Sequence, residues 1–453
     1  MTLWFESALL PDGWARSVRI VIADGRIGSV ERNVSPAADD ERHFVALPGL
    51  TNIHSHAFQR GMAGLTEYRG NAHQDNFWTW RALMYQFLDR IDPDDVAAIA
   101  AQAYCEMLQS GFTRVAEFHY LHHDETGAPY GDCAEMAGRI VEATEQTGIG
   151  LTLLPVYYAQ GGFGGAPAEP GQRRFLSSPD AFANLYEASR TKLRGIAQSH
   201  IGVAPHSLRA VTPADLKRVI ALAPDGPIHM HAAEQIQEVR DSIAWSGRPP
   251  VEWLLDEMAI DHRWCLVHAT HLTQSEMTRL AASGAVAALC PVTEANLGDG
   301  IFPAQSYLAL KGAIAIGTDS NILIDAADEL RALEYAQRLS ARIRNALALG
   351  EPASTGRALF DAVLSGGARA AGVSSVELAP GSGGDIVALD GESPALTARR
   401  KDSLLDSWIF AAGRDAVRDV WCRGVQVVKD GRHIHGERIA ERYRRTLKKL
   451  LTD

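Results

Sequence analysis

The sequence has few cysteines, no long apolar run and no surplus of positive charge. The five cysteines, an odd number in 453 residues, are scattered without a C-x-x-C pair, which excludes a disulfide framework and a zinc ribbon. A membrane-spanning helix needs about 20 consecutive apolar residues, and no such run occurs. The net charge of -11 argues against a general nucleic-acid binder, because phosphate binding needs a surplus of Lys and Arg. We therefore expect a soluble protein of the reducing cytoplasm that binds neither nucleic acid nor membrane.

What the sequence does contain is an ordinary globular composition. With 46% hydrophobic and 22% charged residues, it is long enough for a large core domain and a smaller second one. The first 16 residues carry Glu6 and Asp12 and have no basic leader, so we expect an unprocessed N-terminus. The negative net charge does not forbid an anionic substrate, since a few arginines can make a local positive pocket.

Both ends of the chain show a sequence pattern that is typical of β-strands. The alternation of apolar and polar residues at 18–22 is broken by Asp24 and Gly25, a hairpin turn signal, so 3–45 is predicted to form short antiparallel strands. A similar pattern occurs near the other end, at 385–389, 408–410 and 425–428. The last of these segments is followed by the turn signal Asp430-Gly431. The two ends are therefore predicted to share one small β domain.

Between these ends, short apolar strands alternate with long helical stretches, which is typical of βα units around a parallel sheet. About eight strands are expected, the number that a closed (β/α)8 barrel requires. Their predicted ends lie near His56, His119, Tyr158, His206, His231, His268, Cys290 and Asp319. In such barrels the chemistry sits at the C-terminal ends of the strands, where most of these histidines and the aspartate fall.

The predicted fold class is therefore α/β, a (β/α)8 TIM barrel with a second, smaller β domain built from both chain ends. The predicted domains are the N-terminal part of the small β domain at 1–47, the barrel at 48–377, the C-terminal part of the small domain at 378–435 and a solvated terminal helix at 436–453. The glycine-rich stretches 161–165 and 381–384 complete neither G-x-G-x-x-G nor a G-K-[ST] ending, so both are interpreted as flexible loops.

His54 and His56 follow an apolar run at a predicted strand end. Residues i and i+2 of a strand point to the same side, so both imidazoles can reach one metal ion. A lone histidine is more often a packed or surface residue. The paired spacing at a strand end makes a ligand role as good an explanation as packing.

Further candidates lie at later strand ends. His231 ends an apolar strand and Glu234 follows as the strand turns into a helix, although the segment alone equally fits a helix start with an acidic first turn. His268 ends the next strand, and Asp319 follows a Gly-Thr pair, where capping a helix is the simpler explanation of an isolated aspartate. Together, three imidazoles and one carboxylate are candidate ligands of one zinc ion with an open position for water. Glu234 and His268 are left for proton transfer and polarisation.

Three longer motifs carry a resemblance to a known family: NIHSHAFQR at 52–60, HMHAAEQ at 229–235 and CPVTEANLGDGIFP at 290–303. Over nearly its whole length the chain resembles the amidohydrolase superfamily, and through these motifs it is similar to the formimidoylglutamate deiminases. The resemblance implies a proton-transfer role for Glu234 and a catalytic role beside the metal for His268. The metal ligands that it implies are His54, His56, His231 and Asp319.

The resemblance also implies a homo-oligomer, expected to be a dimer, and substrate contacts from five side chains. These are Gln59, Arg81, Tyr120, His206 and Arg209. Arginine suits bidentate carboxylate binding, and Arg209 follows a predicted strand, although an exposed loop arginine is usually only solvated. Trp78 and Trp80, near Arg81, equally fit core or lid packing.

The activity that the resemblance implies is zinc-dependent hydrolysis of N-formimino-L-glutamate, a small molecule with carboxylates, to N-formyl-L-glutamate and ammonia, as in histidine degradation. Asp319 would orient the attacking hydroxide, Glu234 would shuttle its proton, and His268 would stabilise the tetrahedral intermediate. Two alternatives stay open. One is a deaminase of the same fold acting on N-formimino-L-aspartate, a purine or a pyrimidine. The other is a non-catalytic barrel scaffold, against which the complete ligand set argues.

Overall fold

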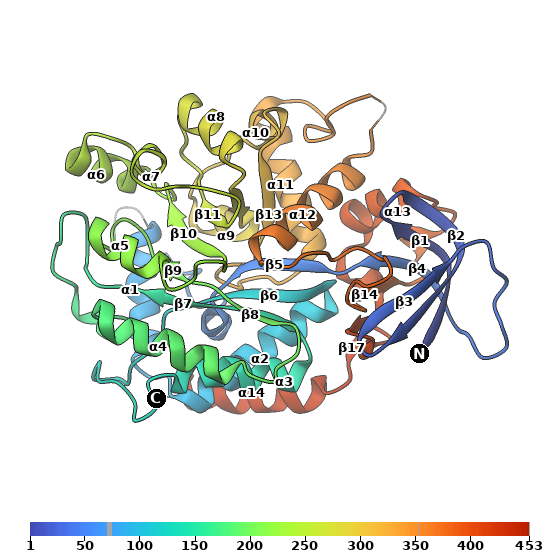
Figure 1. Cartoon of the computed structure of the whole chain (residues 1–453), viewed down its shortest axis with the longest axis horizontal. Coiled ribbons are helices and arrows are strands. Elements are labelled where there is room, and N and C mark those ends of the chain that lie inside the picture. The colour runs from blue at the N-terminus through green and yellow to red at the C-terminus, as the bar shows by residue number, and fades with distance from the viewer. Residues whose placement is uncertain (70–74, 352, 453) are drawn as a thin grey trace.

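The structure, a computed structural model, describes residues 1–69, 75–351 and 353–452. Apolar strands from the middle of the chain form a closed parallel barrel (Figure 1). Two sheets compose it, joined by parallel bridges between Val203 and Ile228 and between Ser55 and Asp319. Its eight strand positions, with β8 and β9 as one interrupted strand, are β5 (Leu50–Ser55), β6 (Phe112–His119), β7 (Gly150–Tyr157), β8 (Ser199–Ile201), β9 (Ala204–Pro205), β10 (Ile228–Ala232), β11 (Trp264–His268), β12 (Val286–Leu289) and β13 (Ala313–Ile316). The predicted barrel is confirmed.

Helices cover the outside of the barrel, and local sequence sets their ends (Figure 1). The side chain of Asp92 caps α2 by accepting a hydrogen bond from the backbone of Asp95, and α3 stops at Gly148, whose φ of +77° suits glycine. The helices of this region are α1 (Phe77–Leu88), α2 (Pro93–Gln109), α3 (Glu135–Thr147), α4 (Pro179–Lys192), α5 (Pro213–Ile220), α6 (Ile236–Ser246), α7 (Pro250–Glu257), α8 (Gln274–Ser283), α9 (Pro291–Leu297), α10 (Ala304–Ala309), α11 (Ala326–Ala341) and α12 (Thr355–Ala370).

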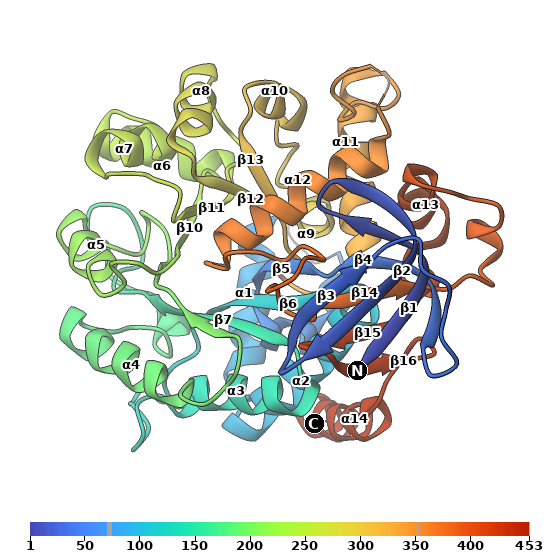
Figure 2. The same cartoon turned by 45° about the vertical axis from the view of Figure 1, so that its right-hand side comes forward.

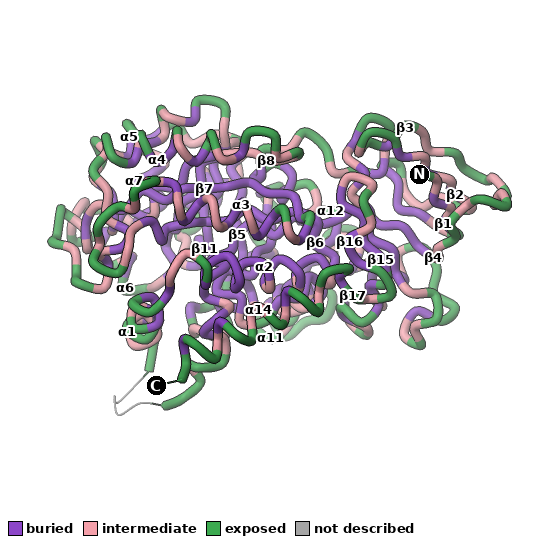
Figure 3. The backbone as a smooth tube through the Cα atoms, turned by 90° about the horizontal axis from the view of Figure 1, so that it is seen from below, coloured by how far each residue is buried: buried purple, intermediate pink, exposed green. Residues whose placement is uncertain are grey.

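Strands from both chain ends form one eight-stranded sheet beside the barrel, as predicted, and Figure 2 shows the blue N-terminal strands next to the red C-terminal ones. In spatial order the strands are β17 (Arg432–His433), β16 (Val425–Lys429), β15 (Val417–Cys422), β14 (Ile386–Leu389), β4 (Glu41–Pro48), β1 (Thr2–Leu10), β2 (Gly13–Ala23) and β3 (Arg26–Glu31). Alternate residues of β4 pack into two different hydrophobic cores. Val45 and Leu47 join the core shared with the barrel, whereas Ala46 packs with Phe5 and Trp421 on the other face. The buried positions in Figure 3 accordingly run through both the barrel and this sheet.

The N-terminal strands differ from the prediction in direction and length. β1, β2 and β3 form the expected antiparallel meander, but β4 pairs in parallel with β1, matching Phe5 with His43. β1 and β2 have 9 and 11 residues, so they are not short. After β3 the chain crosses back through 32–40 and joins the free edge of β1. Which edge of a sheet is free is a property of the assembled sheet, so a local pattern does not reveal it.

The prediction of a strand at 408–410 is wrong, because this segment is helical. α13 (Asp402–Ser407) continues into the π-helical turn η4 (Trp408–Ala412), which buries Trp408 and Ile409. A short apolar run fits a buried strand and a buried helical turn equally well, and tertiary packing decides between them.

The last helix, α14 (Gly436–Leu451), lies within the predicted terminal segment 436–453, whose residue 453 falls outside the described residues. It packs against α2 with Ile439 and Leu450 buried, so the prediction of a wholly solvated helix is wrong for one face. Amphipathic spacing of its apolar residues explains the difference. Among the described helices, none combines the length and the apolar character that crossing a lipid bilayer requires.

Gly366 of α12 lets this helix approach β13, because a Cβ atom there would collide with the carbonyl oxygen of Ile314. We expect Gly366→Ala to lower the free energy of unfolding by about 1–3 kcal/mol, the usual cost of overpacking. The matched control is Gly138→Ala in α3, whose added Cβ would meet only Lys192 Cε at 3.6 Å. That variant should be neutral or up to about 1 kcal/mol more stable, because alanine favours helices over glycine. Denaturant unfolding measures the stability of both variants. A Gly366→Ala variant as stable as Gly138→Ala would contradict the close approach.

Candidate metal and catalytic site

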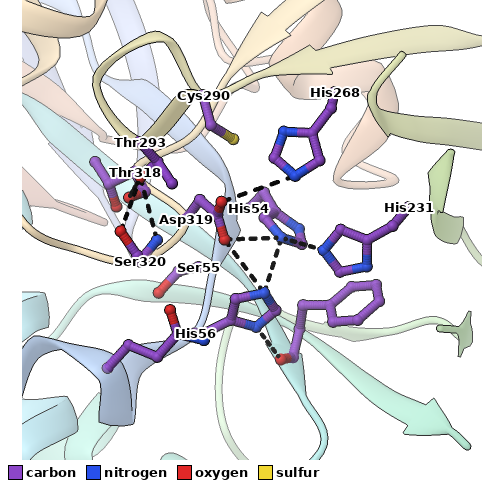
Figure 4. A network of polar contacts seen from close by, with 12 residues as sticks. His54, Ser55, His56, His231, His268, Cys290, Thr293, Thr318, Asp319 and Ser320 are labelled. Atoms are coloured by element: carbon purple, nitrogen blue, oxygen red, sulfur yellow. Dashed lines mark hydrogen bonds and ion pairs between the residues drawn. The ribbon is translucent and has the colours of Figure 1, made fainter. Parts of the chain in front are cut away.

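Polar side chains from several barrel strands meet at the C-terminal mouth of the barrel, where this fold places its chemistry (Figure 4). His54 and His56 come from the end of β5, His231 from β10, His268 from β11 and Asp319 from the loop after β13. The side chains of His54, His56, His231 and Asp319 offer ligand atoms that all lie within 4.8 Å of one another. The structure therefore brings the four predicted ligands together.

The chemistry of these donors fits a bound cation. His54 Nε2 lies 3.2 Å from His56 Nε2 and 3.1 Å from His231 Nε2, and Asp319 Oδ1 lies 3.2 Å from His56 Nε2. The Nδ1 atoms of His56 and His231 face the carbonyl oxygens of Phe118 and His206 at 2.9 and 3.1 Å. A carbonyl only accepts, so each Nδ1 carries the hydrogen and each Nε2 presents a lone pair. A cation among these atoms would accept the lone pairs of His56 and His231 and balance the charge of the Asp319 carboxylate.

Burial keeps these ligands in the protonation states that bind metals. It lowers the pKa of His54 to about 3 and also lowers the pKa of His56 and His231, so all three imidazoles are neutral at neutral pH. Burial alone would raise the pKa of Asp319, but its contacts with imidazole groups, first His54 and then His56 and His268, outweigh burial and hold the pKa below its usual value. The set is therefore three neutral nitrogens and one carboxylate.

The loop that carries Asp319 is tied to β5 through the backbone. The N–H of Asp319 donates to the carbonyl oxygen of His54, and the N–H of His56 donates to the carbonyl oxygen of Asp319, both at 2.9 Å. The amide nitrogen of Asn321 lies 3.1 Å from the carbonyl oxygens of His56 and Asp319. Ligands from the first and last strands of the barrel are thus fixed relative to each other.

Glu234 lies beside this cluster in a position suited to proton transfer. Its carboxylate is 3.9 Å from His268 Nε2 and 3.5 Å from Arg209 Nη2. Burial raises the pKa of Glu234 to about 7, although the positive charges of His268 and Arg209 oppose this rise. The backbone N–H groups of Ala233 and Glu234 donate to the carboxylate of Glu238, which holds the turn in place. A carboxyl group with a pKa near neutrality can both accept and release a proton.

His268 sits among three carboxylates. Burial lowers its pKa, but Glu234, Glu294 and Asp319 outweigh burial and raise the pKa to about 10. Its Nδ1 lies 3.2 Å from Glu294 Oε1, while its Nε2 is 3.8 Å from Asp319 Oδ2. His268 Nε2 therefore faces the cluster of candidate ligands, and Glu294 holds Nδ1 on the opposite side of the ring.

The cluster opens into a pocket beneath α1, and all five side chains predicted to contact substrate line it. Gln59 Nε2 donates to the hydroxyl of Tyr120 at 2.8 Å. Of the two tryptophans that sequence left undecided, Trp80 lines the pocket, and Trp78 lies under Arg81, whose guanidinium is 4.6 Å from its ring centre. The pocket-lining residues among the predictions are Gln59, Arg81, Tyr120, His206 and Arg209.

Two arginines give this pocket a local positive charge in an acidic protein. The side chain of Arg209 is only 11% exposed, and besides Glu234 its nearest carboxylate is that of Glu238, with Nε to Oε2 at 3.9 Å. Arg81 forms an ion pair with the exposed Glu169 at 3.3 Å. Neither distance is a close bidentate pair, so both guanidinium groups keep donors for an anion.

A second hollow, of about 790 Å³, opens at the other end of the barrel, near Pro48, Pro227 and Arg263, which precede β5, β10 and β11. It contains none of the converging ligand atoms. Residues at this end of such barrels serve stability rather than chemistry. The smaller pocket at the strand C-termini is therefore the candidate active site.

Sequence reasoning missed the buried residues that support the site. These are Glu117, Glu238, Glu294 and Asn321. Glu294 lies inside the motif at 290–303, which is a signal for its importance but not for its partner. Glu117 Oε1 accepts a hydrogen bond from the N–H of Ala57 at 2.7 Å and so fixes the turn directly after His56.

Fold and site together define a class of protein: a barrel hydrolase that holds a metal ion at the C-terminal mouth of the barrel. Comparison with known proteins agrees. The sequence model of the amidohydrolase family matches residues 45–427, and that of the formimidoylglutamate deiminase HutF N-terminal domain matches residues 2–44. The formimidoylglutamate deiminase of Pseudomonas aeruginosa is 49% identical over 451 residues, covering 99% of each chain.

Solved structures give the same result. An amidohydrolase from Brucella melitensis is 52% identical and superimposes with a TM-score of 0.97, covering 100% of both chains. An adenosine deaminase from Xanthomonas campestris with bound zinc shares the fold at 24% identity, with a TM-score of 0.81 over 100% of this chain and 98% of the other. The chain belongs to the amidohydrolase family and, within it, to the formimidoylglutamate deiminases. The resemblance seen in the sequence motifs is thereby confirmed, and membership of this metal-dependent family agrees with the donor cluster.

Burial raises the pKa of Glu117 to about 8, so between its ordinary pKa and pH 8 the folded protein keeps a proton that the unfolded chain has lost. The protonated carboxyl therefore contributes stability that is complete at low pH and disappears as pH rises toward 8. We expect Glu117→Gln, which cannot ionise, to remove up to about 1.4 kcal/mol of this dependence per pH unit. Denaturant unfolding of both proteins from pH 5 to pH 8 checks it, and parallel profiles would contradict an ionisable, buried Glu117.

Proposed function

We propose that the protein hydrolyses N-formimino-L-glutamate to N-formyl-L-glutamate and ammonia, a step of histidine degradation. The observation that carries the proposal is the four-ligand cluster with Glu234 in a pocket that also holds Arg81 and Arg209. The similarity to the deiminase of Pseudomonas aeruginosa over nearly the whole chain supports this choice of substrate.

The pocket suits a small molecule with two carboxylates and an amidine group. Arginine binds carboxylates in bidentate geometry, so Arg81 and Arg209 are assigned to the glutamate carboxylates. The side chains of Gln59, Tyr120 and His206 supply further polar groups around the substrate. Holding the substrate in this way places its formimino carbon beside the metal ligands, and such orientation contributes several kcal/mol, about 7 at its best.

We infer one zinc ion, held by His54, His56, His231 and Asp319, because neutral imidazoles and a carboxylate with an open position are typical of catalytic zinc sites. When bound, the ion lowers the pKa of water toward neutrality and polarises the bond under attack. Asp319 orients the attacking oxygen through the carboxylate oxygen that faces His268.

Glu234 and His268 handle the protons and charge of the reaction. Glu234 accepts a proton from the attacking water as the new C–O bond forms at the formimino carbon. It delivers that proton to the imino nitrogen, and the second proton of the water passes from the new hydroxyl group to the same nitrogen as the C–N bond breaks, so ammonia leaves and a formyl group remains. The pKa of Glu234, about 7, suits both directions of transfer. His268 Nε2 faces the same space and stabilises the tetrahedral intermediate.

Localisation and assembly are further proposals. All five cysteines are unpaired, as expected of a protein in the reducing cytoplasm, where we place it. We also propose a homodimer, on the strength of the family resemblance. A deaminase acting on another substrate is the main alternative, because a 5-methylthioadenosine/S-adenosylhomocysteine deaminase of Halobacterium salinarum is 27% identical over 87% of this chain and 85% of its own.

Ammonia release in a coupled assay tests the proposed function. The protein should release ammonia from N-formimino-L-glutamate, lose this activity after chelation and recover it with added zinc. N-formimino-L-aspartate, whose carboxylates lie closer together, should react more slowly, and guanine should not react. Ammonia from guanine without ammonia from N-formimino-L-glutamate would overturn the assignment. A scaffold would release none from any substrate and would not need stoichiometric zinc.

Glu234→Gln tests the proton shuttle, because the amide keeps the size of the side chain but cannot accept the proton. We expect unchanged zinc content and a kcat lower by about 100- to 10,000-fold. Steady-state kinetics and metal analysis measure the two effects. Glu145→Gln, at an exposed position of α3, is the matched control and should behave as wild type. Near wild-type ammonia release from Glu234→Gln would remove the proton-transfer role.

A further inference from the structure

The helix α9 contributes none of the assigned ligands, yet it touches the loops that carry two residues of the site. It starts directly after β12 and lies within the motif at 290–303. Thr293 and Glu294, neighbours on this helix, are both buried and face different partners. Thr293 contacts the loop of Asp319, and Glu294 contacts His268.

Thr293 forms hydrogen bonds to the loop on both sides of Asp319. Its hydroxyl donates to the carbonyl oxygen of Thr318 at 3.1 Å and accepts from the N–H of Ser320 at 3.3 Å, with the Ser320 hydroxyl 3.0 Å away. A threonine hydroxyl has one donor and two acceptor sites, and all three are used here (Figure 4). The residue between Thr318 and Ser320 is Asp319, which is therefore held from its two neighbours.

Glu294 holds the imidazole of His268 from the side away from the cluster. Its Oε1 accepts from His268 Nδ1 at 3.2 Å and from the backbone N–H of Cys290 at 2.9 Å. The second bond anchors the carboxylate to the start of α9. The helix itself is tied to α11, because the N–H of Val292 donates to the buried carboxylate of Glu329 at 3.0 Å.

The two residues held by α9 both have strained backbones. Asp319 has a φ of 44° and His268 a φ of 67°, in the left-handed region that residues other than glycine rarely adopt. Such conformations persist only where surrounding contacts enforce them, and they cluster at functional sites. The contacts of Thr293 are of this enforcing kind, because they hold backbone groups on both sides of Asp319. Glu294 instead fixes the imidazole ring of His268.

We propose that Thr293 and Glu294 are positioning residues, with Thr293 fixing Asp319 for metal retention and Glu294 fixing the ring of His268 for turnover. The proposal rests on the proposed function for the roles of Asp319 and His268. Its specific content is that two adjacent side chains of α9 control two separable properties. A helix with a merely structural role would change both properties together.

Four variants separate the two roles. Thr293→Val removes the hydroxyl group at nearly constant volume, whereas Thr293→Ser keeps it. Glu294→Leu removes the hydrogen-bond acceptor, whereas Glu294→Gln keeps one acceptor oxygen. We expect Thr293→Val to release zinc to a chelator about 10- to 100-fold faster, the usual effect of losing a contact behind a ligand. Thr293→Ser should release zinc at the wild-type rate. Glu294→Leu should lower kcat about 10- to 100-fold with KM and zinc release unchanged, and Glu294→Gln should recover most of that loss.

Wild-type zinc release from Thr293→Val, or wild-type kcat in Glu294→Leu, would overturn the proposal. Equal losses of both properties in both variants would also overturn it. If either variant fails to fold, Thr293→Ala and Glu294→Asp replace them, with the same expectations for zinc release and kcat. Failure of the proposed function has a different signature, which is a wild-type protein that releases no ammonia from N-formimino-L-glutamate. In that case the chelator experiment still decides the role of Thr293.

Discussion

Three imidazole nitrogens and a carboxylate oxygen that point at one place are the constraint on which the rest of this structure depends. His54, His56 and Asp319 lie within 3.5 Å of one another, away from bulk water. The lone pair of His56 and the carboxylate of Asp319 repel each other at this separation, so the cluster needs support from the groups behind it. Rigid strand ends and the carbonyl groups behind His56 and His231 hold it together. The closed barrel therefore preorganises these candidate ligand atoms around one position.

The convergence of the candidate ligands was predictable from sequence, because their arrangement follows from local geometry and a general rule of the fold. Two histidines at i and i+2 share one side of a strand, and the barrel brings the strand ends of His231 and Asp319 to the same mouth. The supporting residues were not predictable in this way. Glu294 meets a histidine 26 positions earlier in the chain, and Thr293 meets a loop 25 positions later. Nothing local to a buried threonine or glutamate indicates such a partner.

The difference between local and long-range interactions also explains which parts of the fold were predictable from sequence. The hairpins at Asp24 and at Asp430 were predictable because turn chemistry is local, and both lie where strands reverse direction. The parallel pairing of β4 with β1 depends on which sheet edge remains free. The helical turn that buries Trp408 depends on the surface that it packs against, which an apolar run of three residues does not encode.

Arg209 is placed to link substrate binding to proton transfer, because its guanidinium lines the pocket beside Glu234. In the free protein its guanidinium lies 3.5 Å from the carboxylate of Glu234 and helps to keep the pKa of that group from rising further. If Arg209 binds a substrate carboxylate as proposed, the arriving negative charge offsets part of this positive influence. The proton affinity of Glu234 then increases when substrate is present, which is when a base must take a proton from water. An arginine with little exposed surface, placed between the substrate pocket and Glu234, would thus join recognition to chemistry, and a surface arginine, screened by water, could not do so to the same extent.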